Sequence, residues 1–258
     1  MKIILDYIWL DGNVISDVRY VTKIIDADIR RHDGIGSFFG KTPRLLDQIE
    51  DEIKIPSILV DGTNINQKSE NNNMVTLKPV KLYQNPLKND SFCVLCEPYD
   101  NEKPHKSDSR IILKELNIDE PLEFLEQFVI YDGEYDNELL FNDKSKINKK
   151  YHYSSNKSGY DELIDDIIFN SINIGINISG VINKYGSGAK WEIIISNNNP
   201  LILADDVVVL RHLMYKLSHK HNKTISFDKK FFMKIESDKD AITDPYLLTK
   251  KLIKSFVV

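Results

Sequence analysis

The chain has 258 residues, 41% hydrophobic and 28% charged, a balance typical of a globular protein with one or two domains. Its formal net charge of -5 argues against nucleic acid and anionic membranes as partners, because neither attracts an acidic protein. The first ten residues hold no apolar run long enough for a signal peptide, and no stretch approaches the roughly 18 apolar residues of a membrane span. We therefore expect a cytoplasmic protein that contacts neither nucleic acid nor membrane.

The two cysteines, Cys93 and Cys96, form a single C-x-x-C within the segment SFCVLCE. This segment is typical of a β-strand, in which positions three apart face opposite sides. The two thiols then cannot share a metal or form an easy disulfide. We expect ordinary buried thiols.

The first hundred residues are typical of strands and turns with one short helix. We expect a strand at 7–12 that runs into an Asp-Gly turn and pairs with 18–25 as a hairpin. The spacing of apolar residues after a Thr-Pro start predicts a short helix over 43–53. A polar loop at 60–67 precedes two further expected strands, at 75–83 and 91–97.

The organisation changes after about residue 100. We expect a helix start at 119–121, strands at 124–131 and 225–228, a long exposed loop at 132–150, amphipathic helices at 160–173 and 203–219, and a closing helix at 244–258. The helix at 203–219 is expected to begin at an N-cap formed by Asp205 or Asp206. Four of its residues are expected to face the core: Val207, Leu210, Met214 and Leu217.

Residues 177–196, NISGVINKYGSGAKWEIIIS, predict two strands joined by a turn. Asn183, Gly186 and Gly188 favour the reversal, because Asn and Gly tolerate a positive φ. Glu192 lies between Trp191 and Ile193, so strand alternation points it to the opposite face from both. A carboxylate in so apolar a strand is costly unless it meets a cation or hydrogen-bond donors.

This segment resembles the core of the eukaryotic-type glutamine synthetases, whose pattern runs roughly ISGxNAEVMPxQWEF. Other short motifs follow in the family's order and extend the resemblance over residues 7–230. They are YIWLDG at 7–12, PSILVDGTNINQ at 56–67, LKPV at 77–80, VLCE at 94–97, KPH at 103–105 and ISFD at 225–228.

The resemblance implies an α+β fold with two parts. Residues 1–100 are expected to form a β-grasp domain, and 101–258 an α/β catalytic domain with a mainly antiparallel sheet that lacks its C-terminal part. Proteins of this family assemble into rings with sites between neighbouring subunits. The resemblance therefore implies a homo-oligomer or association with a complete glutamine synthetase.

The family reaction transfers a phosphoryl group from ATP to glutamate, and ammonia then displaces the phosphate, with Mg²⁺ or Mn²⁺ offsetting negative charge. By resemblance, Glu192 binds metal, and so does Glu126 in the segment that matches the family's E-x-E strand. The second position of that motif is Phe128, which cannot coordinate a metal. The Glu of the family's NAEV falls on Tyr185 or on Lys184, depending on where one residue is inserted. Asp61, in the loop that covers the active site of the neighbouring subunit in the family, is a candidate catalytic residue.

Further departures affect the chemistry. Residues 229–245, KKFFMKIESDKDAITDP, replace a family motif that supplies a metal-binding His, and no Arg follows Arg211. We expect ligase activity to be weak or lost, with Glu126 and Glu192 holding one ion weakly or persisting as inherited acids that are solvated or paired with a Lys. The alternatives are a non-catalytic structural or regulatory subunit, and a gene remnant without selected function.

Overall fold

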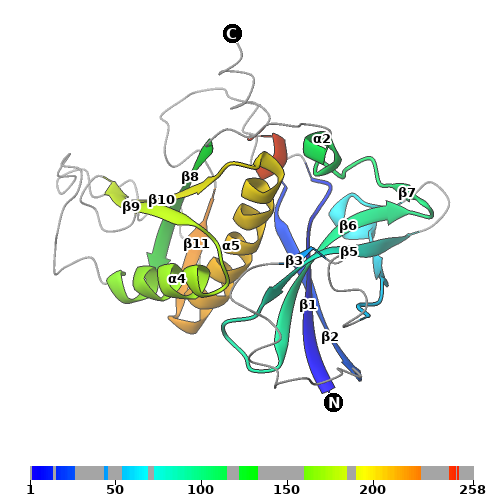
Figure 1. The fold of residues 1–258 in the computed structure, drawn as a ribbon, viewed down its shortest axis with the longest axis horizontal. Coiled ribbons are helices and arrows are strands. Elements are labelled where there is room, and N and C mark those ends of the chain that lie inside the picture. Colours follow the sequence, from blue (N-terminus) through cyan, green and yellow to red (C-terminus); the bar gives the residue numbers. More distant parts are fainter. Residues whose placement is uncertain are drawn as a thin grey trace, which may run out of the picture.

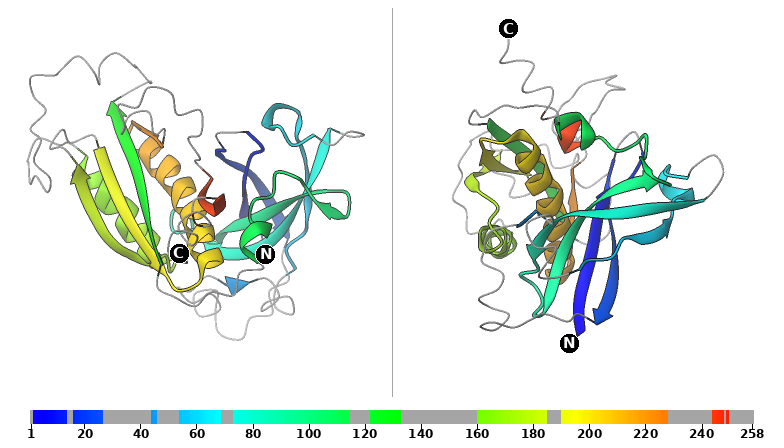
Figure 2. Two further views of the ribbon diagram at one scale, coloured as in Figure 1. Left: turned by 90° about the horizontal axis from the view of Figure 1, so that it is seen from above. Right: turned by 45° about the vertical axis from the view of Figure 1, so that its right-hand side comes forward.

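The computed structural model of this chain describes residues 2–13, 16–26, 44–45, 54–68, 73–114, 122–132, 160–184, 190–227, 244–247 and 249. These residues form two β-sheets with a long helix, α5 (Pro200–Lys220), between them (Figures 1 and 2). A second helix, α4 (Asp161–Asn173), packs against α5 beside the second sheet. Within the described ranges, no helix combines the length and apolar character needed to cross a membrane.

The first sheet, sheet A, is mixed. Its order is β2 (Val18–Asp26), β1 (Lys2–Leu10), β6 (Ser91–Asp100), β5 (Met74–Gln84) and β3 (Arg44–Leu45), with β4 (Ile58–Asp61) beside β5 and β7 (Lys103–Pro104) beside β6. β1 runs parallel to β6, and the other pairs are antiparallel. The mixed α and β architecture agrees with the expected class, while the β-grasp assignment and the boundary at residue 100 stay predictions.

The local patterns of sheet A are confirmed. β1 and β2 pair as the expected antiparallel hairpin, and β5 and β6 cover the two predicted strands. Cys93 lies in the core that faces α5, whereas Cys96 lies in a second core on the other side of sheet A. Both thiols are free and buried, and burial raises the pKa of each. Strand alternation therefore keeps them apart.

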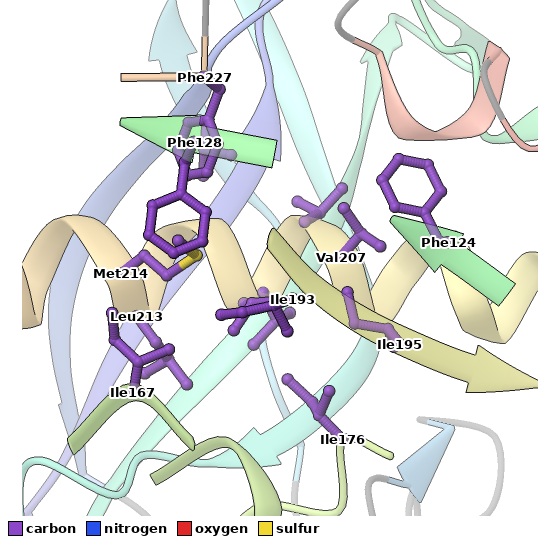
Figure 3. Packing of buried hydrophobic residues seen from close by; sticks show 14 of the residues in the cluster. Phe124, Phe128, Ile167, Ile176, Ile193, Ile195, Val207, Leu213, Met214 and Phe227 are labelled. Carbon is purple, nitrogen blue, oxygen red and sulfur yellow. The ribbon is translucent and has the colours of Figure 1, made fainter. Parts of the chain in front are cut away.

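The second sheet, sheet B, is entirely antiparallel in its described pairs, as expected. Its order is β11 (Lys223–Ser226), β8 (Leu122–Asp132), β10 (Lys190–Asn197) and β9 (Ile178–Lys184). Figure 3 shows side chains of β8 and β10 on one face of this sheet packing onto α5 and α4. That layer includes Phe124, Phe128, Ile193 and Ile195 from the sheet and Ile167, Val207, Leu213 and Met214 from the helices.

The start of α5 differs from the expectation. Its N-cap is Asn199, whose side-chain oxygen accepts hydrogen bonds from the backbone N–H groups of Leu201 and Ile202, and Pro200 follows in the first turn. Pro suits this position because its missing N–H would have no helical partner there. Asp205 and Asp206 are not caps. They lie inside the helix and are buried.

α5 is also buried on all sides rather than amphipathic. The four residues expected to face the core are buried, and so are Val208, Val209, Arg211, His212 and Leu213. The reason is its position, because it contacts β1, β2 and β6 of sheet A and β8, β10 and β11 of sheet B. Packing on both sides leaves little of the helix to solvent, although His219 and Lys220 at its C-terminal end are exposed.

α4 is amphipathic as predicted, with Leu163, Ile164 and Ile167 buried, although Ile172 is exposed.

Of the helix predicted over 43–53, residues 44–45 instead form a strand and 46–53 lie outside the described residues. The expected helix start at 119–121, residues 133–150 of the loop expected at 132–150, and the turn residues 186–188 also lie outside them, while Asp132 ends β8. Residues 245–247 and 249 are helical where a closing helix was predicted. The remaining elements are a 3-10 turn, η2 (Thr63–Ile65), and a short helix, α2 (Ile111–Lys114).

Candidate functional site

The register of sheet B decides how the two candidate metal ligands lie. β10 pairs with β8 so that Glu192 stands opposite Gln127, and Ile193 stands opposite Glu126. Residues directly opposite each other in an antiparallel pair share a face, and neighbours along a strand do not. Glu126 therefore faces the helix side with Ile193, and Glu192 faces the other side with Gln127. The structure does not bring the two carboxylates together on one face.

Glu126 is engaged by an arginine that sequence reasoning did not pair with it. Nε of Arg211, on α5, lies 3.2 Å from Oε2 of Glu126, and Nη2 lies 3.0 Å from each carboxylate oxygen. The side chains are 5% and 3% exposed, so the pair is shielded from solvent. The guanidinium also lies 5.0 Å from the ring centre of Phe227. This arrangement stabilises a charged Glu126 inside the core and occupies its oxygens.

Glu192 points to the other face of sheet B and is 2% exposed. Nε2 of Gln127 donates a hydrogen bond of 2.6 Å to its Oε2. Lys190 lies two residues earlier on the same face, and partial burial lowers its pKa. The prediction that Glu192 points away from Trp191 and Ile193 is confirmed.

Phe128 stands where the resemblance implies a second carboxylate, on the same face as Glu126. It is fully buried and packs near Phe227, with ring centres 6.3 Å apart (Figure 3). The position therefore serves the hydrophobic core. Tyr185, one of the two residues that align with the NAEV Glu, lies outside the described residues, and Lys184 is described only by its backbone pairing with Lys190.

Asp61 lies at the end of β4 and is exposed. Its Oδ1 accepts hydrogen bonds from the hydroxyl of Thr63 at 2.6 Å and from the backbone N–H of Thr63 at 2.8 Å, and these bonds lower the pKa of Asp61. This local turn keeps the carboxylate ionised and directed at solvent.

The loop after Asp61 is fixed to the end of β1. Gln67 is fully buried, accepts a hydrogen bond from the Trp9 indole at 2.9 Å and donates to the Leu10 carbonyl at 2.8 Å. Gly12 permits this contact, because a Cβ there would lie 2.3 Å from the carbonyl oxygen of Asn66. Asp61 is thus held by a rigid loop base. It belongs to sheet A, whereas Glu126 and Glu192 belong to sheet B.

The sequence reasoning missed a buried ionic cluster between sheet A and α5. Arg110 holds Asp205 with Nε and Nη2, at 2.8 and 2.9 Å, and Glu97 of β6 with Nη1 at 2.6 Å. Beside it, Asp206 accepts hydrogen bonds from Lys81 at 3.1 Å and from the Tyr83 hydroxyl at 2.8 Å. The signal was available, because two adjacent acids in the apolar run LILADDVVVL cannot both avoid burial and therefore need cations.

A catalytic pair of Mg²⁺ or Mn²⁺ ions would need several converging carboxylate oxygens. The described part of the chain contains no group of three or more His, Cys, Asp or Glu residues that could hold a metal. Glu126 is bound by Arg211 and Glu192 lies on the opposite face, so this donor set does not fit such a centre.

Comparison with known proteins gives a consistent assignment. The protein-family model described as "Glutamine synthetase, catalytic domain" matches residues 92–238, more than half of the chain. A glutamine synthetase of Streptomyces viridochromogenes is 27% identical over 244 residues, covering 87% of this chain and 62% of the relative. A chloroplastic glutamine synthetase of Chlamydomonas reinhardtii is 24% identical over 248 residues, covering 87% and 59%. A glutamine synthetase of Candida glabrata is 25% identical over 242 residues, covering 89% and 58%.

The chain thus spans about three fifths of the length of these curated relatives. The match to the catalytic-domain family model includes β6, β8, α4, β9, β10, α5 and β11, which together form sheet B, its helices and the junction to sheet A. On this evidence the chain belongs to the glutamine synthetase family.

Proposed function

We propose that this chain is a glutamine synthetase-like protein whose own ATP-dependent ligation of ammonia to glutamate is weak or lost. The family reaction passes through a γ-glutamyl phosphate and draws on ATP with Mg²⁺ or Mn²⁺. It needs metal ligands that converge on the phosphates and on the glutamate carboxylate.

The separation of the two retained carboxylates carries this proposal. Glu126 and Glu192 lie on opposite faces of sheet B, and Glu126 is bound by Arg211. A single divalent ion cannot be held by oxygens that point to opposite sides of a sheet, since ligands must approach within about 2.0–2.6 Å. Glu192, with Gln127 beside it, remains the candidate for weak binding of one ion.

Asp61 is the remaining candidate from the family's catalytic residues. Its exposed, ionised carboxylate and its fixed loop base suit a group presented to another subunit. In the family, this loop covers the active site of the neighbouring subunit, so Asp61 would meet substrate only where another chain presents its site to the loop. This role therefore depends on assembly.

The direct test is glutamine formation by the purified chain with glutamate, ammonium, ATP and Mg²⁺, beside a complete glutamine synthetase as positive control. We expect product at background, and the same background for Glu192→Gln. Glutamine formed well above background, and reduced by Glu192→Gln but not by Gln127→Glu, would overturn the proposal.

Metal binding is tested separately by calorimetry with Mn²⁺. Any saturable binding by the wild-type chain should disappear in Glu192→Gln and persist in Glu126→Gln. Loss of binding in both variants would mean that the two carboxylates hold one ion together, contrary to the register of β8 and β10.

A second candidate is a non-catalytic subunit that associates with a complete glutamine synthetase or with another copy of this chain. Two exposed apolar side chains on strands of sheet A favour it, Ile24 on the outermost strand β2 and Leu59 on β4, at 63% and 62% exposure. Exposed apolar groups on strand edges favour pairing with another chain. Co-purification with a complete synthetase, weakened by Ile24→Lys or Leu59→Lys, would support this role, and a monomer that ignores the enzyme would exclude it.

A further inference from the structure

A small cavity of about 10 Å³ lies between sheet A, the segment 107–110 and Tyr246, next to the ionic cluster that joins sheet A to α5. Its lining includes Leu95 and Cys96 of β6, Asp108, Arg110 and Tyr246. Residues 244–247 and 249, red in Figures 1 and 2, lie between α2 and α5. A space of this size holds one water molecule when polar groups line it.

Carboxylates outnumber cations at this junction. The acids are Glu97, Asp108, Asp205 and Asp244, and the cations whose charges act on them are Arg110, Lys114 and Arg211. Neighbouring Asp206 is separately paired with Lys81. Four carboxylates and three cations leave one negative charge uncompensated in a buried cluster, so we expect at least one of the acids to be protonated.

Hydrogen bonding distinguishes the acids that have donors at their carboxylates from one that lacks them. Asp205 accepts two bonds from Arg110 and one from the Tyr246 hydroxyl at 2.9 Å. Glu97 accepts from Arg110 and is paired with Lys114. Asp244 accepts from the Ser109 hydroxyl and from two backbone N–H groups. Each of these three acids therefore has donors or a cation at its carboxylate.

Asp108 differs from the other three. It is 8% exposed, its Oδ1 accepts from the backbone N–H of Arg110 at 3.2 Å, and its Oδ2 has no hydrogen-bond partner among the described residues. Burial, and then the charge of Glu97, raise the pKa of Asp108 to about 7. A buried carboxylate oxygen without a donor is unfavourable when charged, whereas a protonated one can itself donate.

We propose that Asp108 is a proton-binding residue, that its carboxylic acid donates from Oδ2 to one water molecule in this cavity, and that loss of the proton weakens the junction between sheet A and α5. The water would complete the hydrogen bonding of a polar atom that the protein leaves unpaired. Ionisation would add a fourth negative charge to a cluster on which three cations act.

Four groups act on Asp108 directly: Glu97 and Tyr99 of β6, and Arg110 and Lys114 from its own segment. Tyr246 lines the same cavity. Further charges surround these groups: Asp205 of α5 bonds Arg110 and Tyr246, and Asp244 bonds the Tyr246 backbone and is influenced by Arg211. Burial raises the pKa of both tyrosines, so they stay neutral near pH 7. Burial also raises the pKa of Asp244, which makes it the competing proton site.

The expected pH dependence follows from the shift. The pKa of Asp108 is about 7 in the folded chain and near 3.8 in the unfolded chain, so the folded state binds the proton more tightly. The proton on Asp108 therefore stabilises the folded chain fully below about pH 4. This contribution to the free energy of unfolding falls as the pH rises to about 7 and is absent above that.

The experiment measures the unfolding equilibrium constant by urea denaturation between about pH 5 and pH 8. We compare the wild-type chain with Asp108→Asn, Asp244→Asn and, as a control, Glu102→Gln, whose side chain is 95% exposed. The unfolding equilibrium constant of the wild-type chain should increase with pH. In Asp108→Asn the increase over the same pH range should be at least tenfold smaller. Asp244→Asn and Glu102→Gln should retain it. Full pH dependence in Asp108→Asn, or its loss in Asp244→Asn alone, would overturn the proposal.

A second measurement does not depend on folding of the variant. Infrared spectroscopy of the wild-type chain near pH 6 should show a protonated buried carboxyl group, which disappears as the pH is raised past 7. A high-resolution crystal structure should show one water molecule within hydrogen-bond distance of Oδ2 of Asp108. A wild-type chain with no protonated carboxyl group near pH 6, or with a dry cavity, would contradict the corresponding part of the proposal.

Discussion

Arg211 determines what Glu126 does in this protein. The guanidinium reaches Glu126 across 85 positions of sequence and bonds both carboxylate oxygens inside the core. A buried ion pair adds little net stability compared with apolar residues of the same size, but removing one partner leaves a buried charge. Glu126 is therefore a structural acid in this geometry, and its family role as a metal ligand would require the pair to open.

Replacing Arg211 with Met tests this assignment. We expect the free energy of unfolding to fall by about 3–5 kcal/mol, because Glu126 stays buried without its guanidinium. The double variant Glu126→Gln/Arg211→Met should recover most of the loss. Urea denaturation measures the free energy of unfolding of the single and the double variant.

The control is Lys2→Met, which removes one partner of the Lys2–Asp26 pair at 72% and 79% exposure. Exposed pairs of this kind contribute little, so its denaturation curve should overlay that of the wild-type chain. An Arg211→Met curve that also overlays the wild type would contradict a structural role for the pair.

At the scale of single elements, α5 is the helix on which the fold depends. It starts at the Asn199 cap, continues through Asp205 and Asp206, which bond Arg110 before α2 and Lys81 of sheet A, and carries Arg211 to sheet B. Its length of 21 residues lets it span both sheets. The acids that resemble caps in the sequence are therefore connectors between layers.

Asn199→Ala should lower the free energy of unfolding by about 1 kcal/mol, because two backbone N–H groups in the first turn lose their acceptor. Asn199→Ser keeps an accepting oxygen and should cost much less. Thermal denaturation followed by circular dichroism distinguishes the two variants. Equal stability of Asn199→Ala and the wild-type chain would mean that the helix begins elsewhere.

At the scale of the whole molecule, the described residues are held together by a helix that both sheets share. One continuous core includes Ile8 and Leu95 of sheet A, Phe128 and Ile193 of sheet B, and the buried residues of α5. The ionic cluster around Arg110 adds polar contacts at the same junction. Such a shared core favours unfolding in one cooperative step.

The two tryptophans test this cooperativity, because Trp9 lies in β1 of sheet A and Trp191 in β10 of sheet B. In Trp9→Phe and Trp191→Phe, the remaining indole reports on one sheet. We expect the fluorescence transition and the far-ultraviolet circular dichroism transition to coincide within each variant.

Trp9→Phe removes the hydrogen bond that the indole donates to Gln67, so the substitution itself lowers the stability of this variant. The comparison is therefore made between probes within one variant. Separate transitions for the two sheets would contradict a shared core, and a broad melt without a clear midpoint would favour the gene-remnant alternative.

The sequence by itself determined the features that depend on neighbouring residues. Alternation with a period of two gave the β1–β2 hairpin, the opposite faces of Cys93 and Cys96, and the orientation of Glu192 away from Trp191. The spacing of apolar residues gave α4, and short motifs in order gave the family. Each of these is encoded within a few positions along the chain.

The tertiary structure alone decided the pairings between distant segments. The register of β10 on β8 put Glu126 and Glu192 on opposite faces, and the placement of α5 brought Arg211 to Glu126 and Asp205 to Arg110. A shift of one residue in register would move every side chain of a strand to the other face, and the core that buries one face of β8 and β10 opposes it. Contacts summed over the whole core fix the register, so the chemistry of the two retained acids depends on the complete fold.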